Sequence, residues 1–301
     1  MVGQYTPCVA PGILKRISLI FCAVLCLWVE FAWASPKYPQ RIISMSPSIT
    51  ETLFALGVGD RVVGVTDFCK YPKEACVLPK IGGLLNPSVE TWITLKPDLI
   101  IHQDDSHKLR SNAQNLDIRT LGISMTRLQD IFKTIKLLGQ SLGCEFAAQA
   151  LIQKLQSGIQ NHKLRLKDVP KKSTLLLLNE GGDPNGALYA VGRSTFLGEL
   201  LELAGGENIL TDSTINYPKI SKEFILRHSP EVIIQAGPRA NMTPQEKSEK
   251  LKQWQRFPTL TAVKNKTIYF IGADHILIPG PRFLNTLDYF TRVINPDVFK
   301  D

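Results

Sequence analysis

RIISMSPSITETLFALG (Arg41–Gly57) opens the stretch of sequence that decides the fold, and DLII (Asp98–Ile101) closes it. The first six residues form a short β-branched, apolar run that is typical of a strand, and Pro47 ends it. Ser48 and Glu51 follow with the spacing of a capping box, in which each side chain satisfies a backbone N–H at the start of a helix. The stretch therefore begins with a strand that leads directly into a helix.

The same alternation continues to the end of the stretch. Val62–Thr66 is a second apolar run. After a loop, Asn86 can cap a helix that starts at Pro87, since proline lacks an N–H that would be unpaired there. Pro97 ends this helix, and Asp98–Ile101 form a third, buried strand. Strands and helices that alternate in this way predict a parallel sheet with crossover helices.

The middle of the chain predicts a long helix. Apolar residues recur at helical spacing from Leu128 to Leu142, Gly143 interrupts them, and a second helical run fades near Leu166. A long helix between two α/β segments favours a rigid link over the alternative, a packed helix inside one large sheet domain. We therefore expect an α/β fold of two doubly wound lobes joined by a single long rigid helix. The expected boundaries are residues 35–142 for the first lobe, 143–168 for the helix and 169–301 for the second lobe.

The second half of the chain repeats the pattern of the first. Ser221 can cap a helix that Pro230 ends, and Glu231–Gln235 form a buried strand. Glu90 and Glu223 each lie seven residues before such a proline, 133 residues apart. Acidic residues favour helix N-termini because of the helix dipole, but that explains one glutamate better than two at matched positions. The matched pair indicates two similarly built lobes.

The N-terminus has the anatomy of a secretory signal peptide. Lys15 and Arg16 precede an apolar run from Ile17 to Val29, and Ala32-Trp33-Ala34 is a cleavage pattern before Ser35. The apolar run is shorter than the roughly 20 residues that span a bilayer. We expect residues 1–34 to be removed and the mature chain to leave the cytoplasm. An uncleaved anchor is the alternative.

Composition and charge favour a globular protein without a nucleic-acid surface. The 301 residues are 44% hydrophobic and 21% charged, and the net charge of +8 comes from 35 basic and 27 acidic residues spread along the chain. The densest basic run, Lys163–Lys167, favours a solvated helix end over a nucleic-acid patch.

Three cysteines remain after the leader. Outside the cytoplasm, Cys69 and Cys76 can close a small disulfide loop around Pro72. Two cysteines alone make a poor metal site, so we expect no bound metal ion. Cys144 is expected to be a small buried residue.

Taken together, the chain resembles the periplasmic solute-binding proteins of metal-chelate ABC importers, the group that includes receptors for vitamin B12, siderophores and haem. The resemblance covers residues 38–295. It rests on the order and spacing of Arg41–Gly57, GVTDFCKYP (Gly64–Pro72), IGGLLNPSVETWITLKPDLII (Ile81–Ile101), ELAGGENIL (Glu202–Leu210), INYPKISKEFILRHSPEVII (Ile215–Ile234) and PGPRFLN (Pro279–Asn285). It implies two α/β lobes, a ligand held in the cleft between them, and no chemistry.

The resemblance also gives the matched glutamates a role. In such proteins an acidic residue on each lobe contacts arginines of the permease dimer, and Glu90 and Glu223 occupy those motif positions. Pairing with arginine is directional and can be bidentate, which suits docking in one orientation. The expected partners are a small metal chelate and an ABC permease dimer, with the protein itself a monomer.

Cobalamin is the expected ligand, with a ferric siderophore or haem as the alternative. No separate cofactor is expected. Phe68, Tyr217 and Asp274 match cleft positions of the vitamin B12 receptors, whereas Gln103 and Leu84 depart from tryptophans there. The expected ligand-binding residues come from loops at strand ends: Ser46, Pro47, Phe68, Tyr71, Gly83, Leu84, Gln103, Asp183, Tyr217, Asp274, His275 and Arg282.

An enzyme is the rival class. His102, Asp104, Asp105 and His107 lie close together in the sequence and can be imagined around a cation, as in a metal-dependent chelatase. However, the sequence has no GxSxG, HExxH or phosphate-binding loop, and a solvated loop after a strand explains these residues more simply. We therefore expect a binding protein and not an enzyme.

Overall fold

The computed structural model describes residues 37–83, 86–103, 107–178, 188–211, 214–237 and 242–299. Contacts divide the chain into Met1–Pro39 and one compact unit, Gln40–Asp301, which contains all the elements below. The predicted signal peptide lies outside the described residues and stays a prediction. Among the described residues, no helix has the length and hydropathy needed to cross a membrane.

The first lobe is built on a parallel four-stranded sheet with the order β2-β1-β3-β4. Its strands are β1 (Ile42–Ser44), β2 (Val62–Val65), β3 (Leu99–Gln103) and β4 (Thr120–Ile123). Its helices are α2 (Pro47–Ala55), the 3-10 turn η1 (Gly59–Arg61), α3 (Lys73–Cys76), α4 (Val89–Leu95), α5 (His107–Asn115) and α6 (Leu128–Leu142).

The second lobe contains a mixed sheet with the order β10-β9-β5-β6-β8, and β7 pairs with the start of β5. Its strands are β5 (Lys172–Leu178), β6 (Leu188–Ala190), β7 (Gly206–Asn208), β8 (Lys219–Ile220), β9 (Val232–Gly237) and β10 (Ile268–Gly272). Its helices are α8 (Phe196–Leu203), α9 (Lys222–His228), α10 (Pro244–Gln255), α11 (Thr261–Lys264), α12 (Phe283–Ile294) and the 3-10 turn η2 (Pro296–Phe299). The sequence did not predict β6 and β8, which are antiparallel and too short to show a periodicity.

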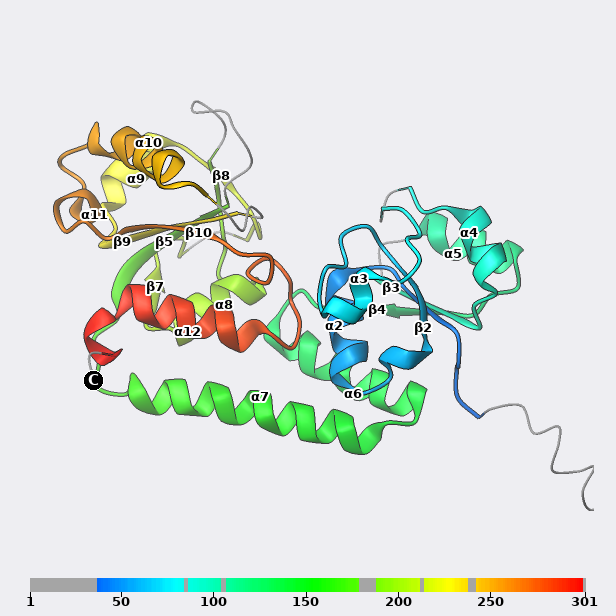
Figure 1. The fold of residues 1–301 in the computed structure, drawn as a ribbon. Helices are drawn as coiled ribbons and strands as arrows, with labels where there is room; N and C mark the ends of the chain where they lie inside the picture. The colour runs from blue at the N-terminus through cyan, green and yellow to red at the C-terminus, as the bar shows by residue number, and fades with distance from the viewer. Residues whose placement is uncertain are drawn as a thin grey trace, which may run out of the picture. The chain divides into compact units, whose positions relative to one another are not determined.

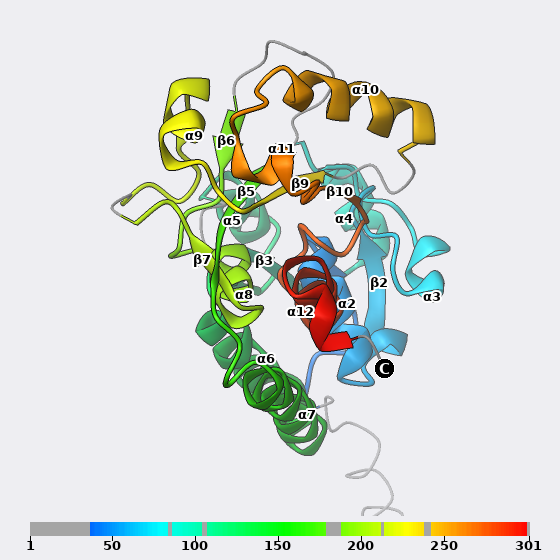
Figure 2. The ribbon, with the colours of Figure 1, turned by 90° about the vertical axis from the view of Figure 1, so that its left-hand side faces the viewer.

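Both sheets have helices on both faces because alternate strand residues point to opposite sides. In the second lobe, Leu175 and Ile233 pack toward α9, α10 and α11, whereas Leu176 belongs to the cluster that includes α8 and α12 (Figure 2). In the first lobe, Ile43 packs with Trp92 of α4, and Ile42 with α2 and α6. This arrangement confirms the predicted doubly wound class.

In sequence order, the long helix α7 (Glu145–Arg165) follows the strands of the first sheet and precedes those of the second (Figure 1). Gly143 links it to α6 in the left-handed region, at a φ of 70°. Gly139 of α6 faces Ala148 so closely that an added Cβ would lie 2.5 Å from the alanine Cβ. Farther along, Gly158 gives the same room to Leu284 of α12. One long helix thus contacts helices of both lobes.

Two helix starts differ from the sequence prediction. Ser46, not Ser48, caps α2: its hydroxyl accepts from the Ile49 backbone N–H at 3.4 Å, and Pro47 is the first helical residue. Proline's fixed φ suits the first helical position, so the helix begins at Pro47 and the residue before it, Ser46, becomes the cap. Likewise α4 is capped by Ser88 and not by Asn86.

The predicted disulfide is not formed. Cys69 is buried, and its sulfur lies 3.1 Å from the hydroxyls of both Thr50 and Thr66. Cys76 is exposed, and its thiol donates to the Lys70 carbonyl at 3.2 Å. The two thiols are therefore directed to different partners. Cys144 is half-buried at the start of α7, and burial raises the pKa of its thiol.

Candidate functional site

The predicted ligand residues follow the carboxyl ends of strands. Ser46 comes after β1, Gln103 ends β3 and Asp274 comes after β10. Carboxyl ends of parallel strands meet at one edge of a sheet, where α/β proteins bind ligands. Leu84 and Asp183 lie outside the described residues, so their placement stays a prediction.

A cavity of about 430 Å³ is lined by residues of both lobes. Gln103 and Tyr217, both predicted from the sequence, line it together. Its other lining residues were not predicted: Ile123, Ser124, Met125, Thr126, Phe196, Leu277 and Pro279. Ile123 ends strand β4 and residues 124–126 follow it, and this position at the end of a strand was the sequence signal that could have pointed to them. The volume is within the usual range of small-molecule sites.

Aromatic side chains near strand ends are left uncovered. Phe68 is 63% exposed and Tyr217 is 41% exposed. Gly83 lies beneath Phe68, since a Cβ added there would be 3.7 Å from its ring. The pKa of the Tyr217 phenol is raised, chiefly by burial of its hydroxyl end, against the effect of a hydrogen bond with Thr195. Tyr217 is therefore neutral at physiological pH.

Ser46 and Pro47 form the start of α2 beneath this region. The Ser46 side chain is buried and lies 2.9 Å from the Ser48 hydroxyl. A Cβ added to Gly280 would lie 3.7 Å from Ser48, so the segment before α12 crosses close to the α2 N-terminus. Ser46 thus supports this turn, and its contact with a ligand stays a prediction.

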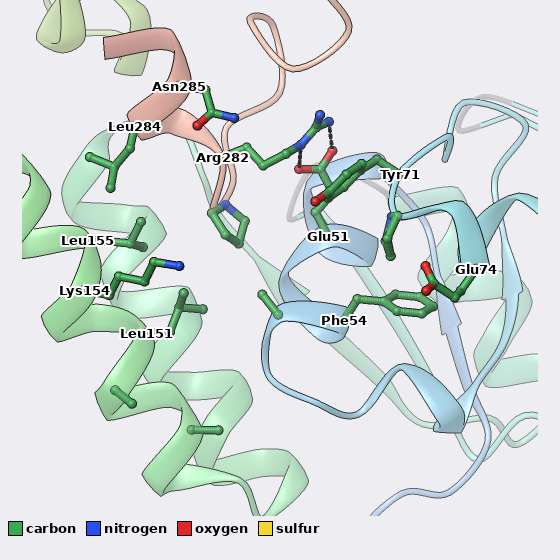
Figure 3. A pocket seen from close by; sticks show the side chains of 15 residues that line it. Glu51, Phe54, Tyr71, Glu74, Leu151, Lys154, Leu155, Arg282, Leu284 and Asn285 are labelled. Carbon is green, nitrogen blue, oxygen red and sulfur yellow. Dashed lines mark hydrogen bonds and ion pairs between the residues drawn. The ribbon is translucent and has the colours of Figure 1, made fainter. Parts of the chain in front are cut away.

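Arg282 joins the two lobes through a contact that the sequence did not predict (Figure 3). Its guanidinium donates to both carboxylate oxygens of Glu51, at 2.8 Å from Nε and 2.5 Å from Nη2. The Arg282 guanidinium carbon lies 4.0 Å from the centre of the Tyr71 ring, and Nη1 lies 3.5 Å from Asp274. Three groups therefore share this arginine, and two of them were predicted to contact the ligand.

The electrostatics of this cluster follow from its burial. Glu51 is buried, and the loss of water raises its pKa although Arg282 opposes the rise. Burial also disfavours the charge on Arg282, but the two carboxylates outweigh it and raise the pKa of the guanidinium. For Asp274, burial favours a higher pKa, yet Arg282 and His275 lower it. Arg282 and Asp274 therefore remain charged at neutral pH.

A second, larger hollow of about 870 Å³ lies beside this cluster, along α7 (Figure 3). Helix α7 contributes Leu151, Lys154 and Leu155, and Phe54 of α2 lines it as well. Arg282 lines this hollow and does not line the 430 Å³ cavity. Arg282 and the pair Gln103 and Tyr217 therefore belong to two different cavities.

Of the four residues suggested for a metal enzyme, the structure describes His102 and His107. His102 belongs to β3 and not to a loop; it is buried, and its Nδ1 lies 2.6 Å from the Gln103 carbonyl. His107 opens α5 and lies 2.9 Å from Arg110. Asp104 and Asp105 lie outside the described residues. Among the residues that the structure describes, no group of three or more histidine, cysteine, aspartate or glutamate side chains can hold a metal ion.

Glu90 and Glu223 are exposed in the first turns of α4 and α9, at matched positions in the two lobes. The pKa of Glu223 is lowered by its own backbone N–H and by the Ser221 hydroxyl. Glu223 thus stays negatively charged even in mildly acidic solution.

Comparison with known proteins agrees with this geometry. An ABC transporter substrate-binding lipoprotein of Bacillus subtilis is 29% identical over 272 residues, which cover 88% of this chain and 83% of that protein. A vitamin B12-binding protein of Pectobacterium atrosepticum is 28% identical over 262 residues, covering 83% and 87%. The fold matches that of a periplasmic haem-binding protein from Pseudomonas aeruginosa with a TM-score of 0.73 at 24% identity, covering 86% and 93%. The family model of the periplasmic binding proteins matches residues 42–275, and the chain belongs to that family.

Proposed function

We propose that this ABC-transporter substrate-binding protein captures cobalamin between its lobes, outside the cytoplasm, and delivers it to a permease dimer. The observation that carries the proposal is the cavity in which Gln103 and Tyr217 come from opposite lobes. A ligand in this cavity contacts both lobes at once, which suits a protein that binds its ligand without transforming it. The vitamin B12-binding relative supports cobalamin as the ligand.

The exposed rings suit a flat chelate. Phe68 and Tyr217 offer apolar and π surface, and a neutral phenol at Tyr217 adds a hydrogen-bond donor. Gln103 supplies an amide that can donate to or accept from the rim of a macrocycle. Haem or a ferric siderophore is the second candidate, favoured by the haem-binding protein of the same fold.

Calorimetric titration with cyanocobalamin, haem and a panel of ferric siderophores tests the ligand. We expect a one-to-one complex with cobalamin at sub-micromolar Kd, weakened about fivefold by Tyr217→Ala because a stacked ring contributes on the order of 1 kcal/mol. Phe146→Ala is the matched control, since Phe146 is 90% exposed on α7 and lines neither cavity. Binding of haem or a siderophore without cobalamin would replace the ligand and keep the class.

We also propose that Glu90 and Glu223 dock the loaded protein on the permease. Charge reversal at both positions, Glu90→Lys with Glu223→Lys, is expected to abolish uptake and to leave chelate affinity unchanged, because neither residue lines the described cavities. Unchanged uptake by this double variant would rule out the docking role.

A further inference from the structure

Helices α4 and α9 are built in the same way, residue by residue. Each has seven residues and a serine cap whose hydroxyl accepts from the third helical N–H, at 3.3 Å for Ser88 and 3.1 Å for Ser221. Each ends at a residue in the left-handed region, Lys96 in α4 and Ser229 in α9, and a proline follows. The correspondence is therefore structural and not only a similarity of sequence.

The strand that follows each helix is fixed in the same way. The Asp98 carboxylate accepts from the Arg41 N–H at 3.0 Å, at the entry to β1. The Glu231 carboxylate accepts from the Ser173 N–H at 2.9 Å, near the start of β5. These bonds set the position of each helix relative to its own sheet, so the outward faces of α4 and α9 are equivalent surfaces.

Each outward face carries an acidic residue and a large apolar one. Ile93 is 57% exposed one turn after Glu90, and Leu226 is 38% exposed one turn after Glu223. The residue just before each apolar one is buried, Trp92 in α4 and Ile225 in α9. Residues three apart share a helix face, so the structure has two equivalent acidic–apolar pairs, Glu90–Ile93 and Glu223–Leu226.

A single exposed apolar side chain is ordinary on a protein surface. Partial exposure recurs at equivalent positions of the two lobes, each time beside an acidic residue. Ile93 is the more exposed of the two, whereas Leu226 also lines a small hollow with Trp254 and Phe257. An apolar contact beside an ion pair excludes water from it and so strengthens the attraction between the charges.

We propose that the two acidic–apolar pairs each contact one subunit of the permease dimer, with Ile93 and Leu226 seated in apolar hollows beside the basic residues that receive Glu90 and Glu223. This inference rests on the docking role proposed above and specifies its surface. Two equivalent pairs on one chain fit a partner that offers two equivalent sites, which a dimer supplies. Charge complementarity sets the orientation, and the apolar contact slows dissociation.

The test uses the full chain and the metal-chelate ABC permease of the same organism, purified as a dimer in lipid nanodiscs. Surface plasmon resonance measures the Kd at several salt concentrations. Ile93→Asn with Leu226→Asn is expected to weaken docking at least tenfold and to leave its salt dependence unchanged, since no charge is altered. Each single variant is expected to weaken it at least threefold. Phe146→Asn, an exposed aromatic position on α7, is the matched control and is expected to stay within twofold.

The glutamate variant separates the two proposals. Glu90→Gln with Glu223→Gln is expected to weaken docking and to flatten its salt dependence. Loss of docking in the glutamate variant, with the asparagine variant within twofold of the parent, would overturn the apolar contact and leave the docking role. An effect at only one of Ile93 and Leu226 would overturn the matched use of both lobes. No change in either double variant would overturn both proposals. Circular dichroism and chelate titration verify that every variant is folded.

Discussion

Arg282 forms the most deeply buried ion pair between the two lobes, whereas the Arg127–Glu199 pair that also joins them is more exposed. The Arg282 side chain is 15% exposed, and it pairs with a Glu51 side chain that is only 2% exposed. A bidentate arginine–carboxylate pair has the strongest geometry available to such groups. The stacked ring of Tyr71 covers the remaining face of the guanidinium. Removing one charge would therefore leave the other buried without compensation.

Arg282→Ala is expected to lower the free energy of unfolding by about 3–5 kcal/mol, because it leaves the Glu51 carboxylate buried and unpaired. Arg292→Ala is the control: Arg292 pairs with Asp288 one turn away, but its side chain is 57% exposed. A solvated pair of this kind contributes about 0.3–0.5 kcal/mol. Urea unfolding measures both. Losses of equal size would show that the buried Glu51–Arg282 pair contributes no more to stability than a solvated pair.

At the scale of elements, α7 depends on close approach at two glycines. Gly139 of α6 faces the Cβ of Ala148, which has no rotatable bond to move it aside. Gly158 of α7 faces the end of the Leu284 side chain, which can change rotamer. The first contact fixes the distance between two helices, and the second only the position of one side chain.

Gly139→Ala is therefore expected to destabilise the protein by about 1–3 kcal/mol, as overpacking does, less the roughly 1 kcal/mol that alanine gains in helix propensity. Gly158→Ala has the same propensity gain and a softer contact, so its effect is expected to be smaller or even stabilising. Thermal unfolding of the two variants compares them directly. A greater loss in Gly158→Ala would contradict this reading of the two contacts.

The contact between α7 and α12 is also expected to respond to pH through His162. Its Nδ1 lies 3.2 Å from the Thr291 hydroxyl, which itself donates to the Leu287 carbonyl, so His162 must be the donor. Burial lowers the pKa of His162 from 6.5; Asp288 opposes this shift and Arg165 adds to it. The unfolded chain therefore takes up a proton at a higher pH than the folded one.

It follows that this contribution to stability is complete above pH 6.5 and is lost as the pH falls below 6.5 toward the lowered value. Denaturant unfolding between pH 7.5 and 5.5 is expected to give a falling free energy for the parent chain and a flatter profile for His162→Gln. Identical slopes would exclude His162 as the source of the pH dependence.

For the whole molecule, one apolar core extends through both lobes. The same cluster contains Ile42 of β1, Ile135 of α6, Leu176 of β5 and Phe290 of α12. Phe132 of α6 meets Phe283 of α12 edge to face, with ring centres 6.2 Å apart. Because these contacts cross from the first lobe to the second, neither lobe can expose its own share of the core without disturbing the other.

Calorimetric unfolding of the chain is thus expected to give a single transition, with equal calorimetric and van't Hoff enthalpies. Cyanocobalamin at a hundred times its Kd is expected to stabilise the chain by about 2.7 kcal/mol if it binds only the folded state. Two separated transitions, one for each sheet, would contradict the continuity of the core.

The sequence by itself determined the alternation of strands and helices that forms the framework of both lobes. Short apolar runs, helix caps and prolines act over a few residues, so β1, β3, α6 and α7 were predicted close to their observed bounds. The match between Glu90 and Glu223 was also visible, because both helices carry the same local signals. Local patterns were ambiguous at the start of α2, where either of two serines could be the cap. They gave no signal for strands of two or three residues, such as β8 and β6.

Only the tertiary structure decided which side chains meet. Glu51 and Arg282 are 231 residues apart, and no periodicity or motif records a contact between them. The sequence therefore assigned Glu51 to a helix cap and Arg282 to the ligand, whereas packing of the lobes pairs them with each other. The cavity lining at residues 123–126 has the same origin. Local propensities act along the chain, but a binding surface forms where distant segments are brought together by burial of the core.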